Sequence, residues 1–244
     1  MRALLLAAGL GTRLRPLTDE IPKCLVPIQG RPLLGIWLDL LFGGGIERVL
    51  VNTHYRAEQV RSFVAGSRWR NRVDLVHEET LLGTGGTARA NAGYFGDESA
   101  LVAHADNLTR FDVRAFLRRH TRRPAGVRIT MMTFDTDSPR SCGIVEEDER
   151  GVVTAFHEKV AEPPGRRANG AVYVFEPEVF ELLLGQEHPV SELSVDVIPH
   201  FLKRIQTYHN ADYHRDIGSV ESLHRAEREY QPSAIRGVPA GSAG

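Results

Sequence analysis

The stretch Arg2-Ala3-Leu4-Leu5-Leu6-Ala7-Ala8-Gly9-Leu10-Gly11-Thr12-Arg13 decides the fold. Residues 2–8 form a continuous apolar run, which is typical of a strand covered on both faces in a parallel sheet. A glycine-rich loop follows this strand directly. The apolar run is too short to span a membrane and lacks the pattern of a signal peptide, so we expect a cytoplasmic protein with no membrane partner.

Strand and helix patterns alternate after this loop, which predicts βαβ units and an α/β protein. From residue 127 onward short strands dominate, and helical patterns then return. The predicted strands are 49–52, 73–77, 100–105, 127–134, 143–146, 152–157, 171–175, 205–209 and 213–217. The predicted helices are 33–41, 57–64, a segment ending near 91, 113–120, 177–184, 194–202 and 219–230.

The composition is that of a globular protein. The chain has 244 residues, 42% of them hydrophobic and 25% charged, and its formal net charge of -1 argues against a general polyanion binder. Cys24 and Cys142 form no CxxC pair, so we expect neither a disulfide framework nor a zinc ribbon, and a reducing compartment fits. Residues 231–244 include ten Gly, Ala, Ser or Pro and are expected to be a disordered tail.

The loop after the first strand has the chemistry of a phosphate site. Gly9 and Gly11 let the backbone approach a ligand, and Arg13 and Lys23 supply charge to neutralise a polyphosphate. A dinucleotide fingerprint would need a third glycine where Leu14 stands, and the Gly-Lys-Ser/Thr of a Walker A loop is absent. The pattern therefore favours nucleoside triphosphate binding of another type.

Residues 9–18, followed by Pro22-Lys23, resemble the signature of the sugar-1-phosphate nucleotidyltransferases. This resemblance implies one domain over 1–230, a Rossmann-like, mixed and mainly parallel sheet flanked by helices, with 1–125 mainly nucleotide-binding and 126–230 mainly sugar-binding. It implies catalytic roles for Arg13, Lys23 and Asp106. The nucleotide contacts that it implies are Ala8, Gly9, Gly11, Thr12, Arg13, Lys23, Glu78, Gly83 and Gly85.

Two of these segments concern the nucleobase. Residues 82–86, Leu-Gly-Thr-Gly-Gly, look like the family segment on which the base packs. Glu78 stands where several uridylyl- and thymidylyltransferases carry a glutamine. Because an ionised glutamate only accepts hydrogen bonds, it suits the two neighbouring donors of guanine better than the single N–H of uracil. Glu78 thus mildly favours GTP.

The resemblance also implies a metal site and a sugar site. Asp106, after an apolar strand, and Asp216, in Asp-Ile-Gly-Ser, resemble the two metal-binding aspartates, and two carboxylates suit Mg²⁺. Ala8 and Ala105 replace family glycines and tighten both pockets. Sugar contacts are expected from Asn107, Glu158, Lys159 and Asn169, with Val160 in place of the proline of the family Glu-Lys-Pro motif.

The implied reaction is Mg²⁺-dependent transfer of a nucleotidyl group from an NTP to a sugar 1-phosphate, with release of pyrophosphate. Guanylyl transfer to a manno- or heptose-type sugar is slightly favoured. The alternatives are uridylyl or thymidylyl transfer to a gluco-type or N-acetylated sugar, or a silent nucleotide-binding module.

Seven arginines between positions 110 and 128 raise the alternative of nucleic-acid binding. Val113, Phe116 and Leu117 are spaced as the buried face of a helix, so we interpret the arginines as its solvated face and expect no nucleic-acid partner. A contact between copies in a homo-oligomer stays open.

Overall fold

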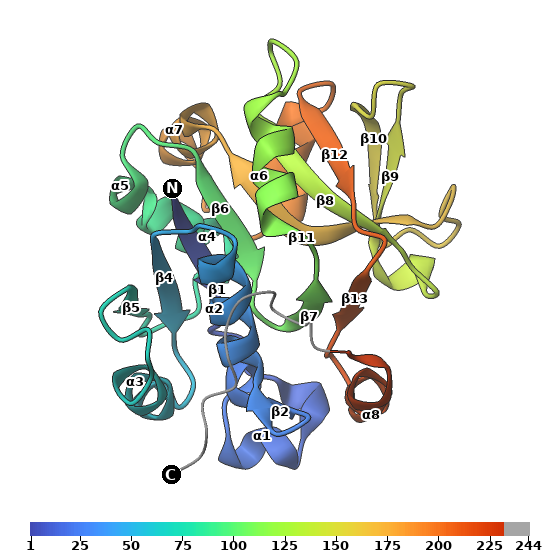
Figure 1. Cartoon of the computed structure of the whole chain (residues 1–244). Helices are drawn as coiled ribbons and strands as arrows, with labels where there is room; N and C mark the ends of the chain where they lie inside the picture. The colour runs from blue at the N-terminus through green and yellow to red at the C-terminus, as the bar shows by residue number, and fades with distance from the viewer. Residues whose placement is uncertain (232–244) are drawn as a thin grey trace.

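The computed structural model describes residues 1–231. At its centre four parallel strands lie side by side in the order β5, β4, β1 and β6 (Figure 1). Strands β1, β4 and β6 are mostly apolar and buried, as expected for strands covered on both faces, whereas β5 lies at the edge of the sheet and is mostly half-buried. Their bounds are β1 Arg2–Leu6, β4 Arg48–Thr53, β5 Val73–His77 and β6 Ala100–His104.

The rest of the nine-stranded sheet is built on β11 (Arg167–Phe175), which pairs antiparallel with β6. Strand β8 (Ile129–Asp135) continues the sheet beyond β11, and β12 (Ile205–His209) pairs parallel with β8. Strands β9 (Gly143–Glu147) and β10 (Val153–Glu158) form a hairpin against the first half of β11. The expected mixed, mainly parallel sheet flanked by helices is confirmed.

Helices cover both faces of the sheet, because successive side chains of its central strands point to opposite sides. Leu5 packs into one core with helices α2 (Leu33–Gly43), α3 (Ala57–Ala65) and α6 (Val113–Thr121). Its neighbour Leu4 packs into a second core with α4 (Gly83–Ala90), α5 (Ala92–Phe95) and α7 (Pro177–Gly185).

Smaller elements complete the fold. Strands β7 (Asn107–Arg110) and β13 (Tyr213–Asp216) form a two-stranded ribbon with Asn107 opposite Asp216. Helix α8 (Val220–Glu229) follows this ribbon and begins at Ser219, whose hydroxyl accepts the backbone N–H of Ser222. The others are β2 Pro27–Ile28, β3 Arg31–Pro32, α1 Leu17–Glu20, η1 Thr12–Leu14, η2 Lys23–Leu25, η3 Pro139–Ser141, η4 Leu193–Val197 and η5 Ile198–Phe201.

The structure departs from the sequence expectations at several elements. The helix expected over 194–202 is a π-turn, η4, followed by a 3₁₀ turn, η5. Strand β11 begins four residues before the expected 171, and β7 was not predicted. Of the tail expected at 231–244, residues 232–244 lie outside the described part. In residues 1–231 no helix has the length and apolar character that a membrane span requires.

The buried face predicted for the arginine-rich helix is confirmed, because Val113 and Phe116 are buried in α6. Several of its arginines contact nearby acceptors. Arg128 pairs with Glu178 at 2.5 Å, and Arg118 lies 3.7 Å from Asp112. The predicted absence of a nucleic-acid partner stays a prediction.

Candidate active site

The carboxyl ends of the four parallel strands meet at one cavity of about 200 Å³. Ala8 and Gly9 follow β1, Asn52 lies near the end of β4, Glu78 follows β5, and His104 ends β6, with Asp106 two residues beyond. Loops and helix N-termini converge at this edge of an open α/β sheet, which is where such sheets bind ligands.

A buried lysine stands at the centre of the predicted phosphate and metal groups. The side chain of Lys23 is only 6% exposed, and its Nζ lies 2.8 Å from Asp106 Oδ2 and 3.5 Å from Asp216 Oδ1. The guanidinium of Arg13 lies 3.7 Å from the other oxygen of Asp216. The structure thus brings together four residues that span more than two hundred positions of sequence.

Local backbone geometry places these charges. Gly11 has φ 64°, and a Cβ there would approach Thr18 Cγ2 to 2.9 Å and Lys23 Cβ to 3.0 Å, so glycine lets the loop fold over Lys23. The hydroxyl of Thr18 donates to the Gly11 carbonyl at 2.7 Å. At the other side, the Ile217 N–H donates to the Asp106 carbonyl at 3.3 Å, which holds the two aspartates at adjacent positions.

The local electrostatics keep Asp106 ionised. Burial pushes the pKa of this carboxyl up, but the ammonium of Lys23 and further hydrogen bonds outweigh burial and hold the pKa below its usual value. Residues 1–231 contain no group of three or more His, Cys, Asp or Glu side chains arranged to hold a metal. Two ionised carboxylates nevertheless match a hard cation that takes its remaining ligands from phosphates and water.

Glu78 lies in the wall of the cavity, and its carboxylate is already held by the protein. The side chain is 5% exposed. Its Oε1 accepts hydrogen bonds from Asn52 Nδ2 at 2.9 Å and from the Thr87 hydroxyl at 2.6 Å, and its Oε2 accepts one from the Leu82 N–H at 3.3 Å. The predicted contact of Glu78 with a base stays a prediction.

The glycines of residues 82–86 have a packing role that the sequence did not suggest. A Cβ on Gly83 would come within 2.3 Å of the Ser191 carbonyl oxygen, and one on Gly85 within 2.5 Å of Val190 Cγ1. The start of α4 therefore lies against residues 190–192, and the Thr84 hydroxyl donates to Glu192 at 2.8 Å. Of the two glycines, Gly83 also lines the cavity.

The sugar candidates lie on or next to three strands, β7, β10 and β11. Because β11 runs antiparallel to β6, Asn169 lies beyond the carboxyl end of β6, where its Nδ2 donates to the Tyr173 hydroxyl at 2.7 Å. Burial raises the pKa of that hydroxyl, and the nearby carboxylates of Glu158 and Glu192 raise it further. Lys159 is exposed and lies 3.3 Å from Glu158, whereas the Asn107 side chain is buried on β7.

Among the cavity residues that the sequence analysis did not single out are Asn52, Thr87 and Glu192. Asn52 had a usable signal, since it is a polar residue near the end of an apolar strand, as Asp106 is. Thr87 and Glu192 had none, because their positions depend on how α4 packs against a distant loop.

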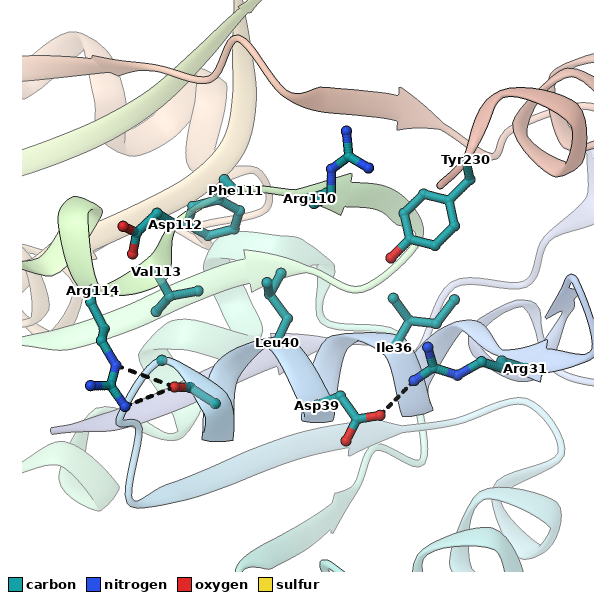
Figure 2. Close-up of a pocket in the computed structure, with 12 residues that line it drawn as sticks. Arg31, Ile36, Asp39, Leu40, Arg110, Phe111, Asp112, Val113, Arg114 and Tyr230 are labelled. Carbon is teal, nitrogen blue, oxygen red and sulfur yellow. Dashed lines mark hydrogen bonds and ion pairs between the residues drawn. The ribbon is translucent and has the colours of Figure 1, made fainter. Parts of the chain in front are cut away.

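Two other cavities do not combine the predicted residues in this way. One, of about 240 Å³, lies between α2, the start of α6 and Tyr230, with the Arg31–Asp39 ion pair at its wall (Figure 2). It contains none of the predicted site residues. The second, of about 480 Å³, adjoins the site on the side of Arg13 and Asp216.

At the carboxyl edge of the parallel strands the fold combines a cationic glycine loop, a buried lysine and paired carboxylates, a combination suited to a phosphorylated ligand and a metal ion. Residues 2–233 match the family model described as Nucleotidyl transferase. The chain belongs to this family, whose members generally use a divalent metal ion.

Individual relatives agree. The chain is 34% identical over 242 residues to a mannose-1-phosphate guanylyltransferase of Mycobacterium tuberculosis. This match covers 97% of the chain but only 65% of the relative. It is 28% identical to the D-glycero-alpha-D-manno-heptose 1-phosphate guanylyltransferase of Aneurinibacillus thermoaerophilus, covering 95% of this chain and 99% of the relative. A UTP–glucose-1-phosphate uridylyltransferase of Synechocystis is 30% identical, covering 98% of this chain and again 65% of the relative.

Solved structures share the fold. A Bacillus anthracis structure assigned as a glucose-1-phosphate thymidylyltransferase superimposes with a TM-score of 0.86 at 21% identity, covering 99% of this chain and 98% of that one. A UDP-glucose pyrophosphorylase complexed with UDP-glucose gives a TM-score of 0.79 at 21% identity, covering 93% and 97%.

Proposed function

We propose that this chain transfers a nucleotidyl group from an NTP to a sugar 1-phosphate, giving an NDP-sugar and pyrophosphate. The observation that carries the proposal is the convergence of Arg13, Lys23, Asp106 and Asp216. Lys23 and Asp106 line the same cavity as Glu78, and Arg13 and Asp216 line the adjoining one. Cations and carboxylates at one end and a hydrogen-bonding group at the other suit a triphosphate and a base.

The chemistry needs no general base. A phosphate oxygen of the sugar 1-phosphate, already ionised near neutral pH, attacks the α-phosphorus of the NTP and forms the new P–O bond. The bond from the α-phosphorus to the bridging oxygen breaks, and its electron pair leaves with pyrophosphate. Acceleration then comes from alignment and from stabilisation of charge on the transferred group.

The cations of the site divide this work. Arg13 is 71% exposed and free to turn toward the β- and γ-phosphates. Lys23 is fixed by two carboxylates, so its Nζ is held in place before substrate arrives. We assign Lys23 to the α-phosphate and to the attacking phosphate, where a preorganised charge has its largest effect.

Asp106 and Asp216 would hold the divalent metal, which we propose is Mg²⁺. When bound, the metal neutralises charge on the phosphate oxygens and helps to align them. The protein contributes the two carboxylates and the β7–β13 ribbon that keeps them together.

Guanylyl transfer to a manno- or heptose-type sugar 1-phosphate is the favoured specificity. One guanylyltransferase relative is named for mannose 1-phosphate and another for a manno-heptose 1-phosphate, and each match covers nearly all of this chain. Uridylyl transfer to a gluco-type sugar is the second candidate, and the Synechocystis relative favours it. We assign sugar recognition to Asn169, Glu158 and Lys159, and we propose that residues 126–230 are the mainly sugar-binding part of one domain over 1–230.

A substrate grid tests the proposal. Pyrophosphate release is measured with Mg²⁺ for GTP, UTP, dTTP, CTP and ATP against mannose, heptose, glucose and N-acetylated sugar 1-phosphates. We expect release with GTP and a manno-type sugar. Release with UTP and glucose 1-phosphate would favour the second candidate, and nucleotide binding without release from any pair would favour a silent binding module.

A further inference from the structure

Four elements meet at one buried side chain, Asn52. Its Oδ1 accepts the backbone N–H of Ala7 at 2.6 Å, and its Nδ2 donates to Glu78 Oε1 at 2.9 Å and to the Thr87 hydroxyl at 3.2 Å. The exposed fractions of Asn52, Glu78 and Thr87 are 3%, 5% and 1%. Asn52 therefore joins the start of the phosphate loop to the carboxylate at the base end of the cavity.

The orientation of this amide follows from its partners. The Ala7 N–H can only donate, so the oxygen of Asn52 must face it. The amide nitrogen then has to face Glu78 and Thr87, and both of its protons find acceptors. Rotating the amide would place its oxygen against the carboxylate and leave a buried N–H unpaired, which is costly.

The same contacts leave the two oxygens of Glu78 in different states. Oε1 accepts from Asn52 at 2.9 Å and from Thr87 at 2.6 Å, whereas Oε2 accepts only the Leu82 N–H at 3.3 Å. The Thr87 hydroxyl has one proton and also lies 2.8 Å from the Gly83 carbonyl, but the carboxylate is the nearer acceptor and the charged one, so it takes the proton. Two donors already occupy the usual acceptor positions of Oε1. The two-pronged contact with guanine expected from the sequence would require a third hydrogen bond there.

We propose that Asn52 and Thr87 are positioning residues for the nucleobase: they hold Oε1 of Glu78 and leave Oε2 to accept a single N–H from the base. This inference rests on the proposed function. It predicts that recognition by Glu78 needs one ring N–H, which guanine and uracil both carry, so the choice between them depends on other parts of the cavity.

The first test compares nucleotides in the wild-type protein. Inosine triphosphate keeps the ring N–H of GTP but lacks the 2-amino group. With a single acceptor oxygen, kcat/KM for inosine triphosphate should stay within about threefold of GTP, whereas loss of one of two hydrogen bonds to a charged group would cost roughly tenfold or more. If UTP is the preferred substrate, 3-methyl-UTP, which lacks the ring N–H, should lose at least that tenfold.

The second test changes the positioning residues. Thr87→Val removes one donor to Oε1, and Asn52→Ala removes the other donor together with the acceptor for the Ala7 N–H. Each should raise KM for the NTP about tenfold, with kcat and KM for the sugar 1-phosphate within about threefold. Thr130→Val is the matched control, because the Thr130 hydroxyl is equally buried and bonded to Gln206 and His120, away from the cavity.

The outcomes separate the two levels of the proposal. The positioning role is overturned if KM for the NTP is unchanged in both variants. It is also overturned if the variants, like the control, lose activity toward both substrates in proportion to a loss of stability. A loss above tenfold with inosine triphosphate overturns the single-acceptor contact. If the wild-type protein binds NTP without turnover, the proposed function fails. The Kd values of the same variants and nucleotide analogues, measured by calorimetry, then decide whether Asn52 and Thr87 position Glu78. If the wild-type protein binds no NTP at all, the proposed function and the positioning role are both overturned.

Discussion

A lysine ammonium that is almost fully buried requires nearby negative charge, because desolvation would otherwise expel its proton. Lys23 has two such partners, Asp106 and Asp216, and its ammonium helps to hold the pKa of Asp106 below its usual value beside the phosphate loop. The arrangement holds the charge in place for a phosphate, since little of the site needs to reorganise when the substrate arrives.

Replacement of Lys23 by Met should therefore abolish most of the activity. We expect kcat for pyrophosphate release to fall by at least about 100-fold, because a preorganised charge at the reacting phosphate is lost. Lys203→Met, at an exposed lysine remote from the cavity, is the control. Turnover of the Lys23 variant within threefold of wild type would remove Lys23 from the catalytic group.

The two loop glycines should respond differently to alanine. Gly11 has φ 64° and its missing Cβ faces Lys23 and Thr18 at 3.0 Å and 2.9 Å, whereas a Cβ on Gly9 would have no neighbour within 4 Å. Gly11→Ala should lower the free energy of unfolding by about 1–2 kcal/mol, and Gly9→Ala by less than about 0.5 kcal/mol. Chemical denaturation measures both, and equal losses would show that the loop tolerates a side chain over Lys23.

At the scale of elements, a polar cluster joins α6, β8 and β11 on the side of the sheet away from the cavity. His120 contacts Thr130 at 2.7 Å and Glu176 at 2.9 Å, and Glu176 also pairs with Arg123. Burial lowers the pKa of His120, and it outweighs the opposing effect of the Glu176 carboxylate. The imidazole is thus neutral in the folded protein near neutral pH.

This cluster predicts a pH dependence of stability. A histidine whose pKa is lower in the folded state binds more protons when unfolded, so its contribution to stability is lost as pH falls below the unfolded value of about 6.5. His120→Gln should make the unfolding free energy less dependent on pH just below 6.5, by at most about 1.4 kcal/mol per pH unit. Denaturation at a series of pH values measures this slope, and an unchanged slope would contradict the assignment.

The sequence predicts those elements whose burial pattern is local. The runs at residues 2–8 and 100–105 are apolar except for Arg2 and His104 and contain β1 and β6, and the spacing of Val113 and Phe116 gives the buried face of α6. Strand β13 was predicted, at 213–217, but β7 has no such signal, because it is four residues long and is fixed by a partner more than a hundred residues away.

At the scale of the whole molecule, the site is assembled from segments that are far apart in sequence. Glycine and charge patterns identify Arg13 and Lys23 locally, and strand-end position identifies Asp106. Only resemblance to a family paired Asp106 with Asp216, since nothing in their spacing indicates that β13 lies beside β7. The contact of Thr84 with Glu192 likewise depends on tertiary packing and was missed.

One continuous sheet carries both the nucleotide and the sugar candidates, so ligand binding should stabilise the chain as one unit. An NTP at 100 times its Kd, with Mg²⁺, adds about 2.7 kcal/mol, which corresponds to a rise in Tm of roughly 5–10 °C for a chain of this size. Asp106→Asn, which removes one proposed metal ligand, should reduce the Mg²⁺-dependent part of this rise, and Asp97→Asn, at an exposed position, should not. Calorimetry should give a single unfolding transition whose Tm rises when NTP binds. Two transitions, of which only one has a higher Tm with NTP, would show instead that residues 1–125 and 126–230 unfold as separate units.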